Sequence, residues 1–433
     1  MTRSGLVFAL LLASAATAQP ATYFVPIVQR TPTTTPIPGA APLQVSLVLP
    51  APGVPASSSF LFGAATQAPV PYALPDLTAG GVANLQSTAD AIVAAPGVLV
   101  AGASQTLLAV SSGGIVSFGT LESTGFVSRG PGVTIPGTRQ LALAAVPDGG
   151  AALLVSNGSQ VTRWDLDVSS GKVQASPGFT GSAAPLSGGD VSLSLVLDGF
   201  HDIGFIGGQT LGDIYVFDAR LDAGPPQAFD LRLLSAGRLT APVTGLALYG
   251  VEVPLYLLAA NGAGLTVYPL PGRLPVSLMS IGQTDLDAGF RVIAVDPSGA
   301  TGPITGPQGV ALTNLPAGSA YPDGMVVLGD PATRGLATLS WSALADGGLL
   351  IDPTDPRGTP APDAGLCPDG GVPDGGSCAP PPSGGPGNLP GPPGPYVPPP
   401  ASSSSCASAP GGPALAVLLL GLVLLVPRRR QRP

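Results

Sequence analysis

The sequence predicts an all-β protein, and more narrowly a six-bladed β-propeller followed by a Pro/Gly-rich linker. Three observations lead to this prediction. The 433 residues include 61 Gly and 52 Pro, which are poor residues for helix interiors. From residue 43 to residue 351, short apolar or β-branched runs alternate with Gly, Pro, Asp and Asn, as in a chain of many short strands. Similar runs recur at intervals that fit blades packed face to face in a closed ring.

Six paired runs define the expected blades. They cover residues 43–62, 90–118, 140–166, 190–217, 243–270 and 309–341. In three of them an apolar strand, a turn of small residues and an alternating strand end in an aromatic residue, namely Phe118, Trp164 and Tyr268. Asn157-Gly158 and Asn261-Gly262 supply residues that tolerate positive φ in tight hairpins. Each unit is therefore expected to form one blade.

The first 18 residues have the three parts of a secretory signal peptide. Arg3 gives the positive charge, residues 6–13 are apolar, and Ala16-Thr17-Ala18 forms a small-residue cleavage site. We therefore expect an exported protein whose mature chain begins at Gln19. A Pro- and Thr-rich segment over residues 19–42 then precedes the propeller.

Residues 352–405 are predicted to form a disordered linker rich in Pro, Gly, Asp and Ser. Such a composition buries too little apolar surface to order itself, so the segment would space the propeller from the cell envelope. Cys367 and Cys378 lie within it. In an oxidising exterior we expect these two residues to form a local disulfide, with a metal role as the alternative.

Residues 406–433 combine Cys406, an apolar run over residues 413–426 and an arginine cluster at 428–430. The run is shorter than the ~20 residues that span a bilayer. This order of parts resembles the myxobacterial C-terminal sorting signal called MYXO-CTERM. The resemblance implies processing or lipidation at Cys406, export and sorting machinery as partners, and attachment to the cell surface or outer membrane. A single-pass transmembrane helix with cytoplasmic arginines is the alternative.

Charge and composition exclude several classes of function. The formal net charge is −8, and Lys172 is the one lysine, so the chain lacks the basic face of a nucleic-acid-binding protein. His201 is the one histidine, which excludes multi-histidine zinc sites. No phosphate-binding Gly-x4-Gly-Lys-[Ser/Thr] loop occurs. Carboxylate, hydroxyl or calcium chemistry remains.

Three segments resemble the β-propeller phytases, calcium-dependent enzymes that release phosphate from inositol hexakisphosphate. They are residues 243–262 with Thr-Gly-Leu-Ala-Leu-Tyr, Tyr321–Asp330 followed by Trp341, and the strand pair over residues 154–166. The resemblance runs in collinear order over about residues 90–350. It implies a six-bladed propeller, calcium as the cofactor and a phosphorylated small molecule as the partner.

The same resemblance gives Asp90, Asp190 and Asp330 as the candidate calcium ligands, and no catalytic residue is assigned. Thr244 stands where the family has a Glu, and Gln308 and Ala311 stand where it has two Asp. Useful calcium affinity needs several carboxylates in one site. We therefore predict a surface-displayed, phytase-derived propeller that has lost its calcium acids and serves in binding or structure. The alternative is an active calcium-dependent phosphomonoesterase, in which calcium neutralises substrate phosphate and activates water.

Overall fold

A computed structural model of the chain describes most of the propeller. The described residues are 22–32, 36–38, 43–64, 69–74, 76–80, 82, 85, 88–123, 125–182, 192–210, 212, 214–220, 232–233, 242–251, 254–270, 290–346 and 349–358. The chain divides into residues 1–378 and 379–433, and the second unit lies wholly outside this range. Asp190, all three cysteines, the expected signal peptide and the C-terminal sorting signal also lie outside it. Within the described part, no helix is long and apolar enough to cross a membrane.

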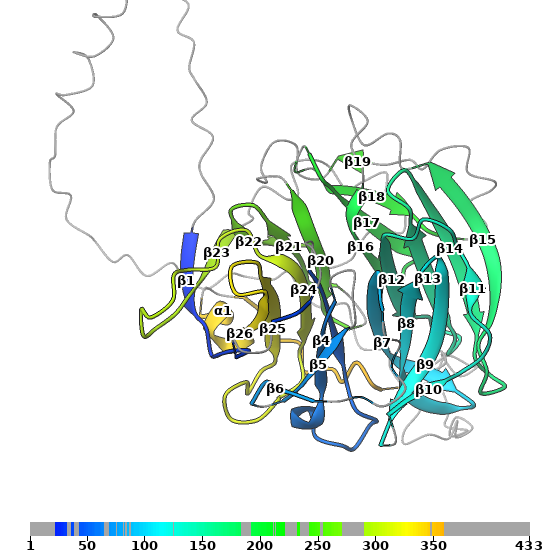
Figure 1. Ribbon diagram of the computed structural model, residues 1–433, viewed down its shortest axis with the longest axis horizontal. Coiled ribbons are helices and arrows are strands. Elements are labelled where there is room, and N and C mark those ends of the chain that lie inside the picture. The colour runs from blue at the N-terminus through cyan, green and yellow to red at the C-terminus, as the bar shows by residue number, and fades with distance from the viewer. Residues whose placement is uncertain are drawn as a thin grey trace, which may run out of the picture. The chain divides into compact units, whose positions relative to one another are not determined.

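Six β-sheets follow one another along the chain, so the predicted propeller is confirmed (Figure 1). Each sheet is one blade, and its three inner strands pair antiparallel in chain order. Blade 1 contains β3 (Gln44–Val48), β4 (Phe60–Ala64), β5 (Val70–Ala73) and β6 (Thr78–Ala79). Blade 2 contains β7 (Ala91–Val100), β8 (Ala103–Ser112), β9 (Ile115–Glu122), β10 (Gly125–Ser128) and β11 (Val133–Thr134). Blade 3 contains β12 (Gln140–Ala145), β13 (Ala151–Ser156), β14 (Gln160–Asp167) and β15 (Gln174–Ser182).

The second half of the ring has the same plan. Blade 4 contains β16 (Ser192–Asp198), β17 (Ile203–Gly208), β18 (Ile214–Asp218) and β19 (Arg232–Leu233). Blade 5 contains β20 (Val243–Tyr249), β21 (Tyr256–Asn261), β22 (Gly264–Pro269) and β23 (Phe290–Val295). Blade 6 contains β24 (Gln308–Thr313), β25 (Met325–Asp330) and β26 (Gly335–Ser340). Two short helices, η1 (Ala56–Ser58) and α1 (Trp341–Ala345), complete the described secondary structure.

The first strand of each blade lies innermost, and these strands form a closed ring. The order of contacts is β3, β7, β12, β16, β20, β24 and back to β3. Neighbouring inner strands run in the same direction, because Gly245 and Gly309 meet near the strand starts while Gly199 meets Ala145 at the strand ends. A Cβ at Gly245 would lie 2.6 Å from the Gly309 Cα, so this close approach requires glycine. The channel therefore has one end at the strand starts and another at the strand ends.

The N-terminal residues complete two blades at their outer edges. β1 (Thr22–Pro26) pairs parallel with β23 and is the fifth strand of blade 5. β2 (Gln29–Arg30) pairs antiparallel with β26 and supplies the fourth strand of blade 6. The sequence predicts that residues 19–42 precede the propeller, whereas part of this segment belongs to its last two blades. β1 has five residues and β2 has two, and each pairs with a strand far along the chain, so no local pattern assigns them to these blades.

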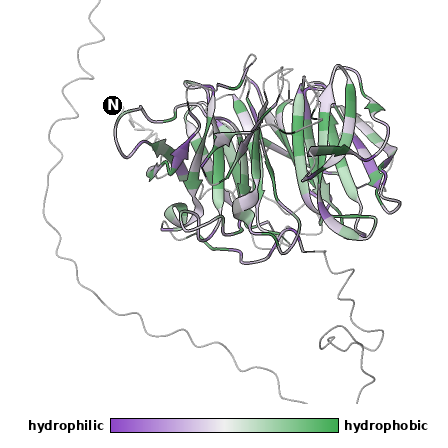
Figure 2. Cartoon of the chain, turned by 60° about the horizontal axis from the view of Figure 1, so that its bottom comes forward, coloured by the Kyte–Doolittle hydropathy of each residue, from purple (hydrophilic) through white to green (hydrophobic). Residues whose placement is uncertain are grey.

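The hydrophobic core lies between the faces of neighbouring blades. Apolar residues follow the strands, as Figure 2 shows. Trp341 is completely buried between blades 5 and 6, and its ring stacks on that of Tyr249 with centroids 3.7 Å apart. Replacing a buried Trp with Ala costs about 3–5 kcal/mol in such a core. The Trp noted from sequence near the end of the sixth unit is therefore a packing residue.

Candidate functional site

A cavity of about 580 Å³ occupies the channel. All six inner strands line it, together with residues 354–356 and 358 from the segment that follows blade 6. We call residues 349–358 the C-terminal strap. The cavity is within the size range of small-molecule sites, which are usually apolar concavities with a few polar groups.

The described lining of this cavity is neutral apart from two carboxylates. Partly exposed apolar residues come from several blades and include Val45, Ala94, Val196 and Leu312. Each inner strand also pairs on one side only, so backbone N–H and C=O groups of its other edge face the channel. This combination suits an uncharged molecule that has an apolar body and can form hydrogen bonds.

At the start of the inner strands, amide and hydroxyl side chains join different blades. The Thr244 hydroxyl donates to the Pro307 carbonyl at 2.6 Å, and the Gln308 side-chain oxygen accepts the N–H of Leu43 at 3.1 Å. Gln44 donates to the carbonyl of Arg139 at 3.0 Å. Thr244 and Gln308 are two of the positions at which the phytase resemblance would require acids. In this chain they bind backbone groups of the adjacent blade instead.

Asp90 and Asp330, the two predicted metal residues that the structure describes, each have protein partners of their own. Asp90 is exposed before β7 and accepts the N–H of Gly113 at 2.9 Å. Asp330 is buried at the end of β25, where it pairs with Arg30 of β2 at 3.0 Å and accepts the Thr333 hydroxyl at 3.0 Å. These contacts give Asp330 a role in holding the N-terminal strand. Calcium binding by Asp90, Asp190 and Asp330 stays a prediction.

The described residues do not fit a calcium ion in the channel. None of them forms a group of three or more His, Cys, Asp or Glu side chains suited to a metal. Asp198 and Asp355 are the two carboxylates in the described lining, and both already have partners. The Asp198 carboxylate is hydrogen-bonded to the His201 ring Nδ1 at 2.7 Å and accepts a hydrogen bond from the N–H of Phe200 at 3.0 Å. Calcium takes six to eight oxygen ligands, so two carboxylates that already have hydrogen-bond partners do not supply a calcium site.

The largest cluster of charges among the described residues joins two blades. Arg163 of β14 is buried, contacts the Asp202 carboxylate at 2.5 Å and donates to the carbonyl of Ala219. Its second acidic partner is Asp165 at 3.1 Å. Burial raises the pKa of Asp202 despite the neighbouring guanidinium. These charges therefore connect blades 3 and 4.

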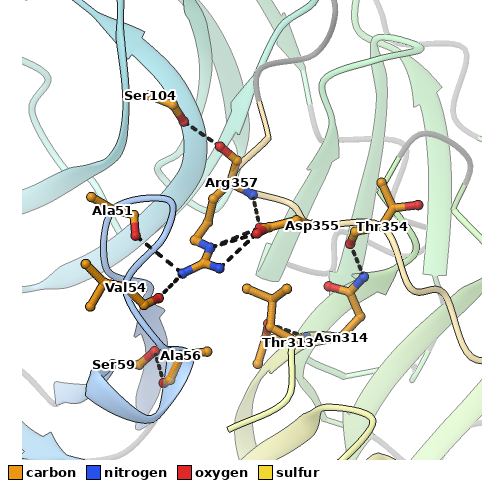
Figure 3. Close-up of polar contacts among 11 residues, drawn as sticks. Ala51, Val54, Ala56, Ser59, Ser104, Thr313, Asn314, Thr354, Asp355 and Arg357 are labelled. Carbon is orange, nitrogen blue, oxygen red and sulfur yellow. Dashed lines mark hydrogen bonds and ion pairs between the residues drawn. The ribbon is translucent and has the colours of Figure 1, made fainter. Parts of the chain in front are cut away.

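The C-terminal strap is held at the strand ends by bonds to four blades. In blades 5 and 6, the Tyr249 hydroxyl accepts the N–H of Asp352 at 3.0 Å, and the Asn314 amide donates to the Asp352 carbonyl at 2.8 Å. In blades 1 and 2, Arg357 donates to the Val54 carbonyl at 2.6 Å, and Ser104 donates to the Arg357 carbonyl at 2.6 Å. Figure 3 shows the Arg357 contacts and the bond that the Asn314 amide donates to the Thr354 carbonyl.

The sequence predicts a linker from residue 352 onward, whereas residues 352–358 are bonded to the propeller. Burial raises the pKa of Tyr249 to about 12, so its hydroxyl stays protonated while it accepts from the strap. One signal was present in the sequence. The Asp-Gly-Gly repeats of the linker begin only after residue 363, whereas Ile351-Asp352-Pro353-Thr354 still follows an apolar pair.

No protein-family model and no curated protein matches the chain. The chain is similar at low identity to many solved structures, among them the following three. Regucalcin from Agrobacterium tumefaciens, described as a calcium-binding protein, is 11% identical, and the match covers 73% of this chain and 94% of that one with a TM-score of 0.41. A functionally unknown protein from Desulfotomaculum acetoxidans is 14% identical over 68% and 83% of the two chains, with a TM-score of 0.40.

The third is the extracellular domain of a protein described as a one-component system from B. thetaiotaomicron. It is 14% identical with a TM-score of 0.34, and the match covers 64% of this chain but 31% of the other. The strand pairing and the closed ring of inner strands define the six-bladed propeller.

Proposed function

We propose that this protein is an exported, surface-displayed binding propeller whose channel holds a small uncharged molecule. One observation carries the proposal: the described lining of a cavity of about 580 Å³ combines apolar and uncharged polar groups, and its two carboxylates both have partners. An anionic substrate such as inositol hexakisphosphate needs cations to neutralise its charge. The described lining contains no Lys or Arg.

Surface display is supported by the sequence. The signal-peptide pattern over residues 1–18 directs export, and the Cys406, apolar run and arginine order of a MYXO-CTERM-like signal would retain the protein at the surface. The phytase-like motifs support a phytase-derived propeller. An active phytase remains the alternative function, and it requires acids that Thr244 and Gln308 do not provide.

Binding is tested with the uncharged fluorescent probe N-phenyl-1-naphthylamine and the full-length chain. Ala94→Phe and Leu312→Phe each add a ring to a different wall of the cavity, while Ile115→Phe adds one at a site that is 47% exposed on blade 2. We expect each channel variant to weaken probe binding about tenfold or more, equivalent to ~1.4 kcal/mol. Ile115→Phe should bind like the unchanged chain.

Circular dichroism and the melting temperature establish that each variant is folded. Absence of probe binding by the unchanged chain would contradict the proposal. Equal binding by all four proteins would also contradict it, because the probe would then be held elsewhere, for example by the apolar run at residues 413–426.

A further inference from the structure

We propose that the C-terminal strap is a plug that closes the channel at the ends of the inner strands. The strap supplies residues 354–356 and 358 to the wall of the same cavity that residues at or just after the strand ends line, such as Ala145, Gly199 and Asn314. No other segment of the described chain outside the inner strands and the turns that follow them lines this cavity. The strap thus occupies the end of the channel opposite Gln44 and Thr244.

The first half of the strap is fixed to blades 5 and 6. The Leu350 N–H donates to the Tyr256 hydroxyl at 2.7 Å, and the Val251 N–H donates to the Asp352 carboxylate at 2.8 Å. The Asn314 amide donates to the carbonyls of both Asp352 and Thr354. One asparagine therefore satisfies two backbone groups of the strap where it turns into the channel.

The second half is fixed to blades 1 and 2 through Arg357. This arginine is 8% exposed, and its guanidinium reaches the Val54 carbonyl and forms several bonds with the Asp355 carboxylate (Figure 3). The Pro356 carbonyl lies so close to Gly97 that a Cβ there would approach it to 2.7 Å. Gly97 has a φ of +79°, so glycine is required for both its conformation and this contact.

The strap can leave without disrupting a sheet. It contains no strand, and its bonds to the blades run through side chains such as Asn314, Tyr249 and Arg357 rather than through a β-ladder. Segments held in this way open locally at lower cost than core strands. We therefore infer that solutes reach the channel at the strand ends only when the strap is released. This inference does not depend on the identity of any channel ligand.

Cysteine labelling tests the plug directly. The three native cysteines are replaced with serine in the full-length chain, and a single cysteine is introduced as Ala145→Cys at the strand ends or as Val45→Cys at the strand starts. Both positions line the cavity and are partly buried. The strap is released by Asn314→Ala together with Arg357→Ala, and the rate of reaction with N-ethylmaleimide is followed by mass spectrometry.

We expect strap release to raise the labelling rate of the Ala145→Cys protein about tenfold or more, and to leave that of the Val45→Cys protein unchanged. Equal rates for the Ala145→Cys protein with and without the release substitutions would overturn the inference. A similar rise at both positions would also overturn it, because the whole propeller would then have loosened. If the double release variant does not fold, Asn314→Ala alone provides the same comparison.

Discussion

The two terminal segments of the described chain complete the propeller in different ways. The N-terminal segment joins the sheets themselves, since β1 extends blade 5 and β2 supplies the outer strand of blade 6. The C-terminal strap crosses from blades 5 and 6 to blades 1 and 2 and is held largely by side chains. The N-terminal strands therefore complete the sheets of the propeller, whereas the strap covers the channel without joining a sheet. The two segments should accordingly contribute to stability in different ways.

Breaking the ion pair between Arg30 and Asp330, which holds the N-terminal strand β2, should cause the largest loss of stability. The Asp330 side chain is 3% exposed, and its loss leaves the Arg30 charge partly buried without its carboxylate. We expect Asp330→Ala to lower the free energy of unfolding by about 3 kcal/mol, measured by denaturant titration. Arg220→Ala is the control, because the Arg220 side chain is 50% exposed in its pair with Asp218, and its loss should cost less than about 1 kcal/mol. Equal losses would contradict a structural role for the buried pair.

The strap should respond to Asn314→Ala without a comparable loss in the blades. Removing the amide leaves the carbonyls of Asp352 and Thr354 without this donor, at a cost of about 1–2 kcal/mol to strap docking. Limited proteolysis should then cut within residues 349–358 sooner than in the unchanged chain. A large fall in melting temperature with no faster cleavage would show that the strap and the blades unfold together.

The bonds between inner strands at the other end of the channel can be tested with Gln308→Ala. The substitution removes the acceptor of the Leu43 N–H, which joins blade 6 to blade 1. We expect a loss of about 1 kcal/mol in the free energy of unfolding and no change in cleavage of the strap. An increase in stability would contradict a role for this glutamine in joining the blades.

The smallest expected effect is a pH dependence of strap docking. Hydrogen bonds from Arg357 hold the pKa of Asp355 below its ordinary value, so the folded state favours the charged carboxylate. This stability is present above the pKa of the unfolded chain, about 4, and is lost as the pH falls through the lowered folded value. Because the Asp355 side chain is 41% exposed, solvent screening keeps the effect small.

Trp341 fluorescence can report this transition, because its indole N–H donates to the Leu350 carbonyl at 3.3 Å. In a Trp164→Phe background, we expect a fluorescence change below pH 4 that disappears in Asp355→Asn. Persistence of the same change in Asp355→Asn would assign it to another carboxylate.

The six blades could be predicted because each is a local repeat of strand, turn and strand. The order of the units in sequence is the order of the blades in space, including the first unit before residue 86. β2 has two residues, and its partner β26 lies about 300 positions away, so no local pattern indicated it. Pro353, Asp355 and Pro356 have the composition of the linker that follows, which concealed the strap.

The sequence predicted that the candidate site lacks acidic residues at the positions of Thr244 and Gln308, but it did not predict the contacts that these two side chains form. The sequence showed Thr244 and Gln308 at positions where the phytase resemblance required acids. That these side chains bind the Pro307 carbonyl and the Leu43 N–H depends on contacts between blades, which a linear pattern does not contain. Asp330 was chosen from a motif, and only its burial beside Arg30 gives it a structural role.

The central claim is that the channel is a neutral binding site, and phosphate release from inositol hexakisphosphate tests it most directly. The full-length chain is assayed with millimolar calcium and again with a chelator, after its fold has been verified by circular dichroism. We predict no phosphate release above background in either condition. Calcium-dependent release by the folded protein would contradict this account and establish the phytase alternative.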